Sequence, residues 1–129
     1  MAAQLNHTIV ACHDKHLSSA YLTVILGLPP AQPFAHFMVV TLANGVSLDF
    51  MEKAGPIAHQ HYAFLVSDAE FDAGLERVKA HDQTYWADPA CTRTNTINHH
   101  FGGRGFYFED PDGHLLELIT TPYGSEDPS

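Results

Sequence analysis

Apolar and polar residues alternate along several short segments of the chain, and this pattern predicts β-strands. Residues 5–11 (LNHTIVA) alternate in this way and are rich in β-branched side chains. The dipeptide Asn44-Gly45 favours a tight hairpin turn, because both turn positions need positive φ. Further strands are predicted at residues 34–43, 46–51, 61–66, 84–87, 105–109 and 114–120.

Two other segments have the apolar spacing of helices. The first helix is predicted to follow Asp14, a good N-cap residue, and to end at Gly27, which is followed by two prolines. The second begins after Ser67, which forms a capping box with Glu70, and it ends near His81.

The order of a strand, a helix and then further strands occurs twice, which predicts an α+β fold of two βαβββ modules. Half the chain alone is short for burying both faces of a sheet, so the modules are expected to pack together as one domain, residues 1–129. The sheets would form a paired, cupped mixed sheet around a metal cleft, with the helices outside. The modules are expected at residues 5–53 and 60–121, with a loose tail at 122–129.

Charge and composition exclude several classes of protein. The chain of 129 residues has 6 Lys and Arg against 15 Asp and Glu, a net charge of -9, which argues against a nucleic-acid partner. No apolar run is long enough for a membrane span, and residues 1–6 lack the features of a secretory signal. The two cysteines form no disulfide framework. We expect a cytoplasmic protein that acts on a small molecule.

Four ionisable residues fall on strand faces that are otherwise largely small or apolar. His7 and His61 lie near the starts of the first strands of the two modules, and Asp49 and Glu117 lie in the last strands. A buried carboxylate needs a partner, and a divalent cation would supply one. Two imidazoles and a carboxylate suit Fe, Mn, Zn, Co or Ni and leave coordination positions open. His59 has the same strand parity as His61, but Pro56 and the connector argue that it lies outside the sheet.

Three segments resemble the vicinal oxygen chelate superfamily, which includes glyoxalase I, extradiol dioxygenases, fosfomycin-resistance thiol transferases and bleomycin-resistance proteins. Residues 106–118 (FYFEDPDGHLLEL) resemble the family ending F-x-D-P-D-G-x-x-x-E. Residues 5–7 and 61–66 (HYAFLV) are similar to the family's two ligand-bearing strands. The resemblance covers residues 5–123. It implies the paired-module fold, a homodimer, and a metal held by His7, His61 and Glu117.

One position departs from the glyoxalase pattern. Glyoxalase I has a fourth ligand, a Glu, near Asp49, and Asp is one methylene shorter. Asp49 is therefore a possible fourth ligand or a pocket residue. A three-ligand site of this kind is more similar to those of the extradiol dioxygenases and the thiol transferases.

The long loop of the second module and the strand after it offer candidate catalytic groups. His100 could act as an acid or base near neutral pH. Arg104 could pair with an anionic substrate group, and Tyr107 could donate to a bound oxygen, although a packing role suits Tyr107 equally well. The same loop also contains Asn95, Asn98 and His99.

Two functions are compatible with these residues. The first is a metal-dependent enzyme, a dioxygenase or a lyase/isomerase, acting on a small substrate that chelates the metal through oxygens. The alternative is a metal-free binding protein of the bleomycin-resistance type, which the negative charge and Trp86 favour slightly. A binding groove has no need of the His7, His61 and Glu117 trio, so the sequence favours the enzyme.

Overall fold

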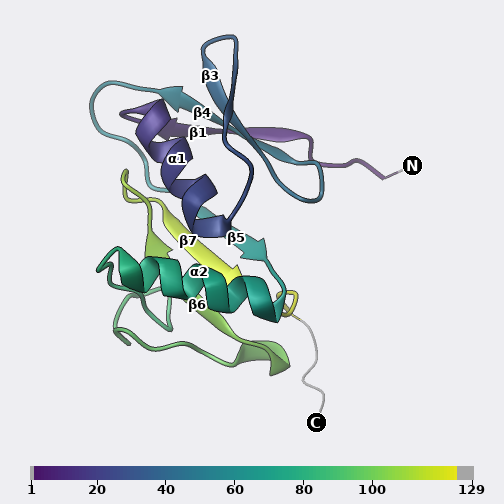
Figure 1. Ribbon diagram of the computed structural model, residues 1–129, viewed down its shortest axis with the longest axis vertical. Coiled ribbons are helices and arrows are strands. Elements are labelled where there is room, and N and C mark those ends of the chain that lie inside the picture. Colours follow the sequence, from purple (N-terminus) through teal and green to yellow (C-terminus); the bar gives the residue numbers. More distant parts are fainter. Residues whose placement is uncertain (1, 125–129) are drawn as a thin grey trace. The chain divides into compact units, whose positions relative to one another are not determined.

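The chain forms two units, Met1–Ala58 and His59–Ser129, in a computed structural model that describes residues 2–124. Each unit combines one mixed β-sheet with one α-helix, as Figure 1 shows. The predicted α+β class is confirmed.

The first unit has a four-stranded sheet. Its elements are β1 (His7–Cys12), α1 (Lys15–Leu26), β2 (Gln32–Phe34), β3 (Phe37–Thr41) and β4 (Ser47–Glu52). The strand order is β1-β4-β3-β2, and β1 runs parallel to β4, so the first and last strands of the unit are neighbours. Helix α1 packs against β3 and β4.

Local signals set the ends of α1, as predicted. The Asp14 carboxylate accepts hydrogen bonds from the backbone N–H groups of His16 and Leu17 at 3.0 and 3.1 Å. Gly27 ends the helix with φ 66° and donates its N–H to the carbonyls of Thr23 and Val24. Glycine adopts this left-handed conformation without a steric penalty.

The strand predicted at residues 34–43 is present as β3, but it begins only at Phe37, because a turn separates it from Phe34 at the end of β2. The turn lies at Ala35 and His36, and Ala35 has φ 52°. Alanine rarely adopts positive φ, and no Gly, Asn or Pro lies at the turn to indicate it. The hairpin at Asn44-Gly45 is confirmed, with Gly45 at φ 87°.

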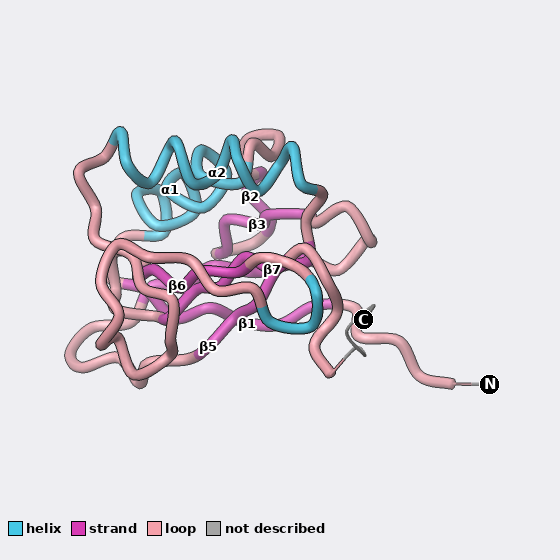
Figure 2. Tube along the Cα trace, turned by 90° about the horizontal axis from the view of Figure 1, so that it is seen from below, coloured by secondary structure: helices cyan, strands magenta, loops and turns pink. Residues whose placement is uncertain are grey.

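The second unit has a three-stranded sheet. Its elements are β5 (His61–Leu65), α2 (Asp68–Ala80), a 3₁₀ turn (His100–Gly102), β6 (Gly105–Glu109) and β7 (Leu115–Ile119). The strand order is β5-β7-β6, and β5 runs parallel to β7. Helix α2 lies over one side of this sheet (Figure 2).

The strand expected at 84–87 is a second correction, which makes this unit βαββ rather than βαβββ. Trp86 forms only isolated bridges, with Thr94 and with Tyr107. The segment after it folds back as an irregular loop, so no continuous ladder forms beside β6.

The core of the second unit lies between α2 and one face of its sheet. Phe71 of α2 packs edge-on against Phe106 of β6, with ring centroids 5.2 Å apart, and both side chains are fully buried. Because side chains alternate along a strand, the opposite face carries His61, Tyr107 and Glu117. That second face is where the candidate chemistry lies.

The remaining expectations concern the capping box, the tail and the membrane. The Ser67 hydroxyl accepts from the Glu70 N–H at 3.2 Å, and the Glu70 carboxylate accepts from the Ser67 N–H at 2.8 Å, as predicted. Residues 125–129 of the expected tail lie outside the described residues. Among residues 2–124, no helix is long and apolar enough to cross a membrane.

Replacement of Asp14 tests the capping of α1. We expect Asp14→Ala to lower the free energy of unfolding by about 1 kcal/mol, because two N–H groups lose their acceptor. Asp14→Asn keeps a side-chain oxygen and should stay within a few tenths of a kcal/mol of the wild type. Urea unfolding followed by circular dichroism measures both, and equal losses would show that the cap contributes nothing specific.

Candidate functional site

The second unit brings two of the predicted metal ligands together. The parallel pairing of β5 with β7 places His61 opposite Leu115 and Ala63 opposite Glu117. The His61 ring donates from Nδ1 to the Leu115 carbonyl at 2.9 Å, and its Nε2 lies 3.1 Å from Oε1 of Glu117. Residues 56 positions apart in sequence thus share one contact.

The hydrogen bond to Leu115 makes His61 a suitable metal ligand. A carbonyl can only accept, so Nδ1 holds the ring proton and Nε2 has the lone pair that a metal requires. Two ligand atoms about 2.1 Å from one ion, at an angle of about 90 to 110°, lie about 3.0 to 3.4 Å apart. The separation of Nε2 from Glu117 Oε1 falls in that interval, so the donor pair fits a divalent cation. Without an ion, a proton on Nε2 can occupy the same place.

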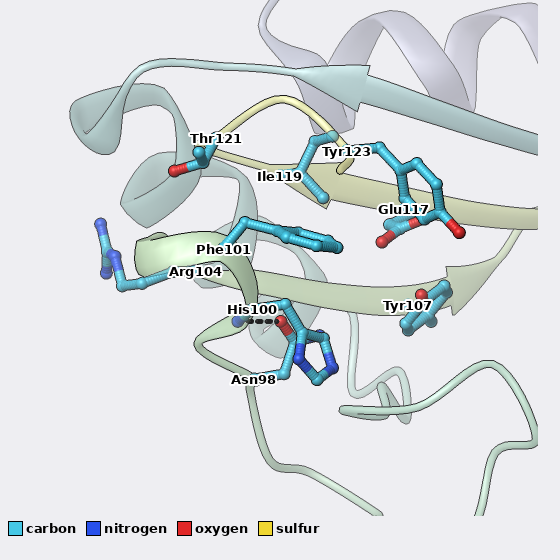
Figure 3. Close-up of a pocket in the computed structure, with 9 residues that line it drawn as sticks. All are labelled: Asn98, His100, Phe101, Arg104, Tyr107, Glu117, Ile119, Thr121 and Tyr123. Carbon is cyan, nitrogen blue, oxygen red and sulfur yellow. Dashed lines mark hydrogen bonds between the residues drawn. The ribbon is translucent and has the colours of Figure 1, made fainter. Parts of the chain in front are cut away.

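A pocket of about 270 Å³ opens beside Glu117 (Figure 3). It is mixed in character, with one carboxylate, aromatic rings and a few hydroxyl and amide groups. The lining residues are Asn98, His100, Phe101, Arg104, Tyr107, Glu117, Ile119, Thr121 and Tyr123.

Tyr107 is a firm hydrogen-bond donor in this pocket. Burial raises the pKa of Tyr107 to about 12, with further contributions from the charge of Glu117 and from the hydrogen bond to that carboxylate. The phenol therefore stays protonated at neutral pH. It can donate to a carboxylate or a substrate oxygen, and it is a poor base.

His100 and Phe101 enter the pocket from a braced loop. The buried Asn98 side chain donates to the Ala87 carbonyl at 2.8 Å and accepts from the His100 N–H at 3.2 Å. Phe101 has φ 58°, which is uncommon for a bulky residue, and its ring points toward Glu117 and Tyr107 (Figure 3). The sequence did not indicate Phe101, Ile119, Thr121 or Tyr123 as pocket residues, because none of them lies in a motif with metal-ligand or acid–base spacing.

Arg104 is engaged by α2. Its guanidinium donates to Asp72 at 2.7 Å and to Asp68 at 3.0 Å, and it lies 4.4 Å from the centre of the Phe71 ring. The hydrogen bonds to these carboxylates raise the pKa of Arg104. In Figure 3 the side chain points away from Glu117. Its positive charge is therefore largely balanced before any ligand binds.

The first unit places His7 and Asp49 by the same register. In the parallel pair of β1 and β4, His7 lies opposite Ser47, and Asp49 lies two residues further along, as Glu117 does beyond Leu115. His7 and Asp49 line a pocket of about 550 Å³. The predicted equivalence of these positions in the two modules agrees with both registers.

The local contacts of this second pair differ. The exposed His7 ring donates from Nδ1 to the Asn6 side-chain oxygen at 2.7 Å. Asp49 is buried, and it accepts from the Ser47 hydroxyl at 3.2 Å. Within either unit, the described residues contain no group of three His, Cys, Asp or Glu side chains that could hold a metal.

Asn95, His99 and His59 are not among the residues that line the pocket beside Glu117. The Asn95 N–H donates to the Tyr85 carbonyl at 2.6 Å, which closes the loop on itself. His99 is exposed. The His59 ring lies beside the fully buried His114, with centroids 6.5 Å apart.

Several known proteins resemble this chain in sequence or structure. The family model described as Glyoxalase/Bleomycin resistance protein/Dioxygenase superfamily matches residues 4–118. A solved structure named Oxidase ChaP-H1 is 52% identical, covers 96% of this chain and 100% of its own, and has a TM-score of 0.94. The glutathione transferase FosA of Serratia marcescens is 29% identical over 124 residues, 92% of this chain and 81% of FosA.

A more distant structure carries a metal. It is a mutant of the fosfomycin resistance protein FosX from Listeria monocytogenes, complexed with Mn(II) and a dihydroxypropylphosphonic acid. It is 23% identical, covers 95% of this chain and 96% of its own, and has a TM-score of 0.69, so the likeness shows the fold.

The raised pKa of Tyr107 can be tested by titration. Among the 5 tyrosines, we expect one to ionise near pH 12 in the wild type and to be missing from Tyr107→Phe, as followed by tyrosinate absorbance. Because the folded pKa exceeds the unfolded value of about 10, the stability contribution is complete below about pH 10 and is lost as the pH rises toward 12. The wild type should therefore lose stability more steeply than Tyr107→Phe in that interval.

Tyr123→Phe is the matched control, since Tyr123 is 88% exposed in the same pocket. This variant should keep the high transition. Loss of the high transition from Tyr123→Phe, or its persistence in Tyr107→Phe, would contradict the assignment of that transition to Tyr107.

Proposed function

The chain belongs to the Glyoxalase/Bleomycin resistance protein/Dioxygenase superfamily, and we propose that it is a divalent-metal-dependent enzyme that oxidises a small, oxygen-chelating substrate. The observation that carries the proposal is the distance of 3.1 Å between His61 Nε2 and Oε1 of Glu117, a residue that lines a pocket. Because Nδ1 of His61 donates its proton in a hydrogen bond to the Leu115 carbonyl, the Nε2 lone pair is available to a metal. This is a typical arrangement for a metal-binding histidine.

We propose His7, His61 and Glu117 as the metal ligands, with Asp49 as a fourth ligand or a pocket residue. The second unit supplies two of these groups. His7 also has its Nδ1 hydrogen-bonded, to the side-chain oxygen of Asn6 rather than to a backbone carbonyl, which leaves its Nε2 available. The donor set suits Fe, Mn, Zn, Co or Ni. A bound ion of this kind supplies a Lewis acid for substrate oxygens and, where it is redox-active, a centre for oxygen chemistry.

Pocket residues would bind and orient the substrate. Tyr107 donates a hydrogen bond to a substrate oxygen or holds Glu117 in place. His100, exposed at the pocket, moves a proton to or from the substrate near neutral pH. Phe101 and Ile119 keep water away from the reacting groups.

Arg104 has a more indirect role in this proposal. Its contacts with Asp68 and Asp72 join the start of β6 to α2 and hold one wall of the pocket. A substrate with a strongly anionic group would have to compete with those two carboxylates. We therefore propose a substrate that carries little negative charge beyond its chelating oxygens.

The relatives favour oxidation over the other reactions of the superfamily. The 52% identical relative is named an oxidase, whereas the transferase FosA is 29% identical. An oxidase or dioxygenase reaction is therefore preferred to a lyase/isomerase reaction. We also propose a cytoplasmic homodimer.

The alternative remains a metal-free protein that sequesters an aromatic or cationic ligand. The aromatic lining of the pocket and the charge of -9 favour it. The two functions differ in whether the purified protein binds a metal.

Metal titration decides between them. We expect protein purified without chelators to bind about one divalent ion per chain, and Mn(II) or Fe(II) to raise its melting temperature, because the ion binds only the folded site. His61→Ala, Glu117→Ala and His7→Ala should each abolish or greatly weaken this binding. Isothermal titration calorimetry and elemental analysis measure it.

His81→Ala is the control, since His81 is exposed at the end of α2 and its Nδ1 donates to the Arg77 carbonyl. It should bind metal as the wild type does. A wild-type protein without metal, and without thermal stabilisation by Mn(II), Fe(II), Zn(II) or Ni(II), would overturn the enzyme proposal in favour of the sequestering function.

A further inference from the structure

A fully buried histidine lies three residues before Glu117, and none of the roles above uses it. His114 is 0% exposed, although histidine is rarely so completely enclosed. It follows the Asp110-Pro111-Asp112-Gly113 turn and directly precedes β7. A buried imidazole in this place needs a structural explanation.

The His114 ring accepts a hydrogen bond from the main chain of the neighbouring strand. The Gln60 N–H donates to His114 Nδ1 at 3.0 Å. A backbone N–H can only donate, so Nδ1 presents its lone pair and the ring proton lies on Nε2. The Gln60 carbonyl in turn accepts from the Leu115 N–H at 2.9 Å. Both backbone groups of Gln60 are therefore bound to residues 114 and 115.

This contact continues the β5–β7 ladder by one residue. Paired strands begin with His61 opposite Leu115, and Gln60 comes immediately before them. A strand end normally frays because its outermost groups lack partners. Here a side chain supplies the missing acceptor and fixes the backbone next to His61.

The His114 main chain is itself held firmly. Oδ1 of Asp110 accepts from the N–H groups of Asp112 and His114, both at 2.9 Å, and the Asp110 N–H donates to the His114 carbonyl at 3.0 Å. The rings of Tyr62 and His59 pack edge-on against the imidazole. The turn therefore fixes the position of the His114 ring, and the hydrogen bond to that ring fixes the backbone of Gln60.

We propose that His114 is a positioning residue for His61. By accepting the Gln60 N–H, it holds the start of β5 in register with β7, so that His61 Nδ1 reaches the Leu115 carbonyl and Nε2 stays 3.1 Å from Glu117. This inference rests on the proposed function, because it assigns His61 and Glu117 to the metal. It connects the Asp-Pro-Asp-Gly turn to the metal site through a second path, beside the direct one along β7.

The test compares His114→Asn with His114→Leu. The two replacement side chains have nearly the same shape and leave similar cavities, but only Asn offers an acceptor to the Gln60 N–H. With Mn(II) alone as the probe, we expect His114→Leu to weaken Mn(II) binding on the order of tenfold. Mutation of residues that orient a metal ligand typically lowers metal affinity by at least this factor. His114→Asn should recover most of that affinity. Calorimetry gives the dissociation constants.

Val78→Ala controls for a general loss of stability. Val78 is fully buried in α2 and takes no part in the Gln60 contact. The Val78→Ala variant should have a lower melting temperature but an unchanged Mn(II) dissociation constant. A merely structural role for His114 would instead give equal affinity in the Asn and Leu variants, with stability alone reduced, and would overturn the proposal.

A second measurement needs no variant, in case His114→Leu does not fold. In uniformly ¹⁵N-labelled wild type, the bond should give a scalar coupling between the Gln60 amide nitrogen and His114 Nδ1. Absence of that coupling from a well-resolved Gln60 signal would overturn the inference. Wild type that binds no Mn(II) would refute the metal site itself, whereas wild type that binds it and a Leu variant that binds it equally well would refute only the role of His114.

Discussion

The parallel pairing of β5 with β7 is the constraint on which the candidate site depends. It places His61 two residues behind Glu117 on one face of the sheet, about 6.6 Å along the strand direction. An imidazole can cover that distance only if it leans forward along the strand. The Leu115 carbonyl makes it do so by accepting from Nδ1. A shift of one residue in the pairing would send one of the two side chains to the helix-facing side and separate them.

The charges around the pocket complement this arrangement. Arg104, the cation nearest to it, is already bound by Asp68 and Asp72, so it adds little positive potential near Glu117. Tyr107 stays protonated and so adds no negative charge of its own. What remains is a mostly enclosed carboxylate next to a histidine nitrogen, with the Glu117 side chain 12% exposed. A divalent cation would balance that carboxylate more completely than a single proton does.

Features determined by neighbouring residues were the ones that the sequence predicted well. The Asp14 cap, the Ser67–Glu70 capping box and the Asn44-Gly45 turn each depend on a few consecutive residues, and all three are present. The α+β class followed from the order of these elements. The turn at Ala35 was missed because it uses a residue type that seldom adopts positive φ.

Long-range contacts were less accessible from the sequence. The alternation of side chains along each strand indicated that His61 and Glu117 each lie on a largely small or apolar strand face. Their contact, however, depends on the register between two strands that are distant in sequence. The pairing of Arg104 with α2 and the acceptor role of His114 depend on tertiary structure in the same way, and no local pattern shows either. Motif spacing therefore indicated which residue types matter, but it did not show which of them already form contacts with other residues.

The two units apply one register to different side chains, and the difference has a chemical consequence. In each unit the first and last strands are parallel, with a histidine opposite one residue of the last strand and a carboxylate two positions later. In the second unit the carboxylate is a Glu, long enough to meet the imidazole. In the first unit it is an Asp, whose Oδ1 already accepts from Ser47, while the His7 ring is bonded to Asn6. The same backbone arrangement therefore gives a preformed pair of ligands in one unit and two separately engaged groups in the other, which is why Glu117 is a stronger ligand candidate than Asp49.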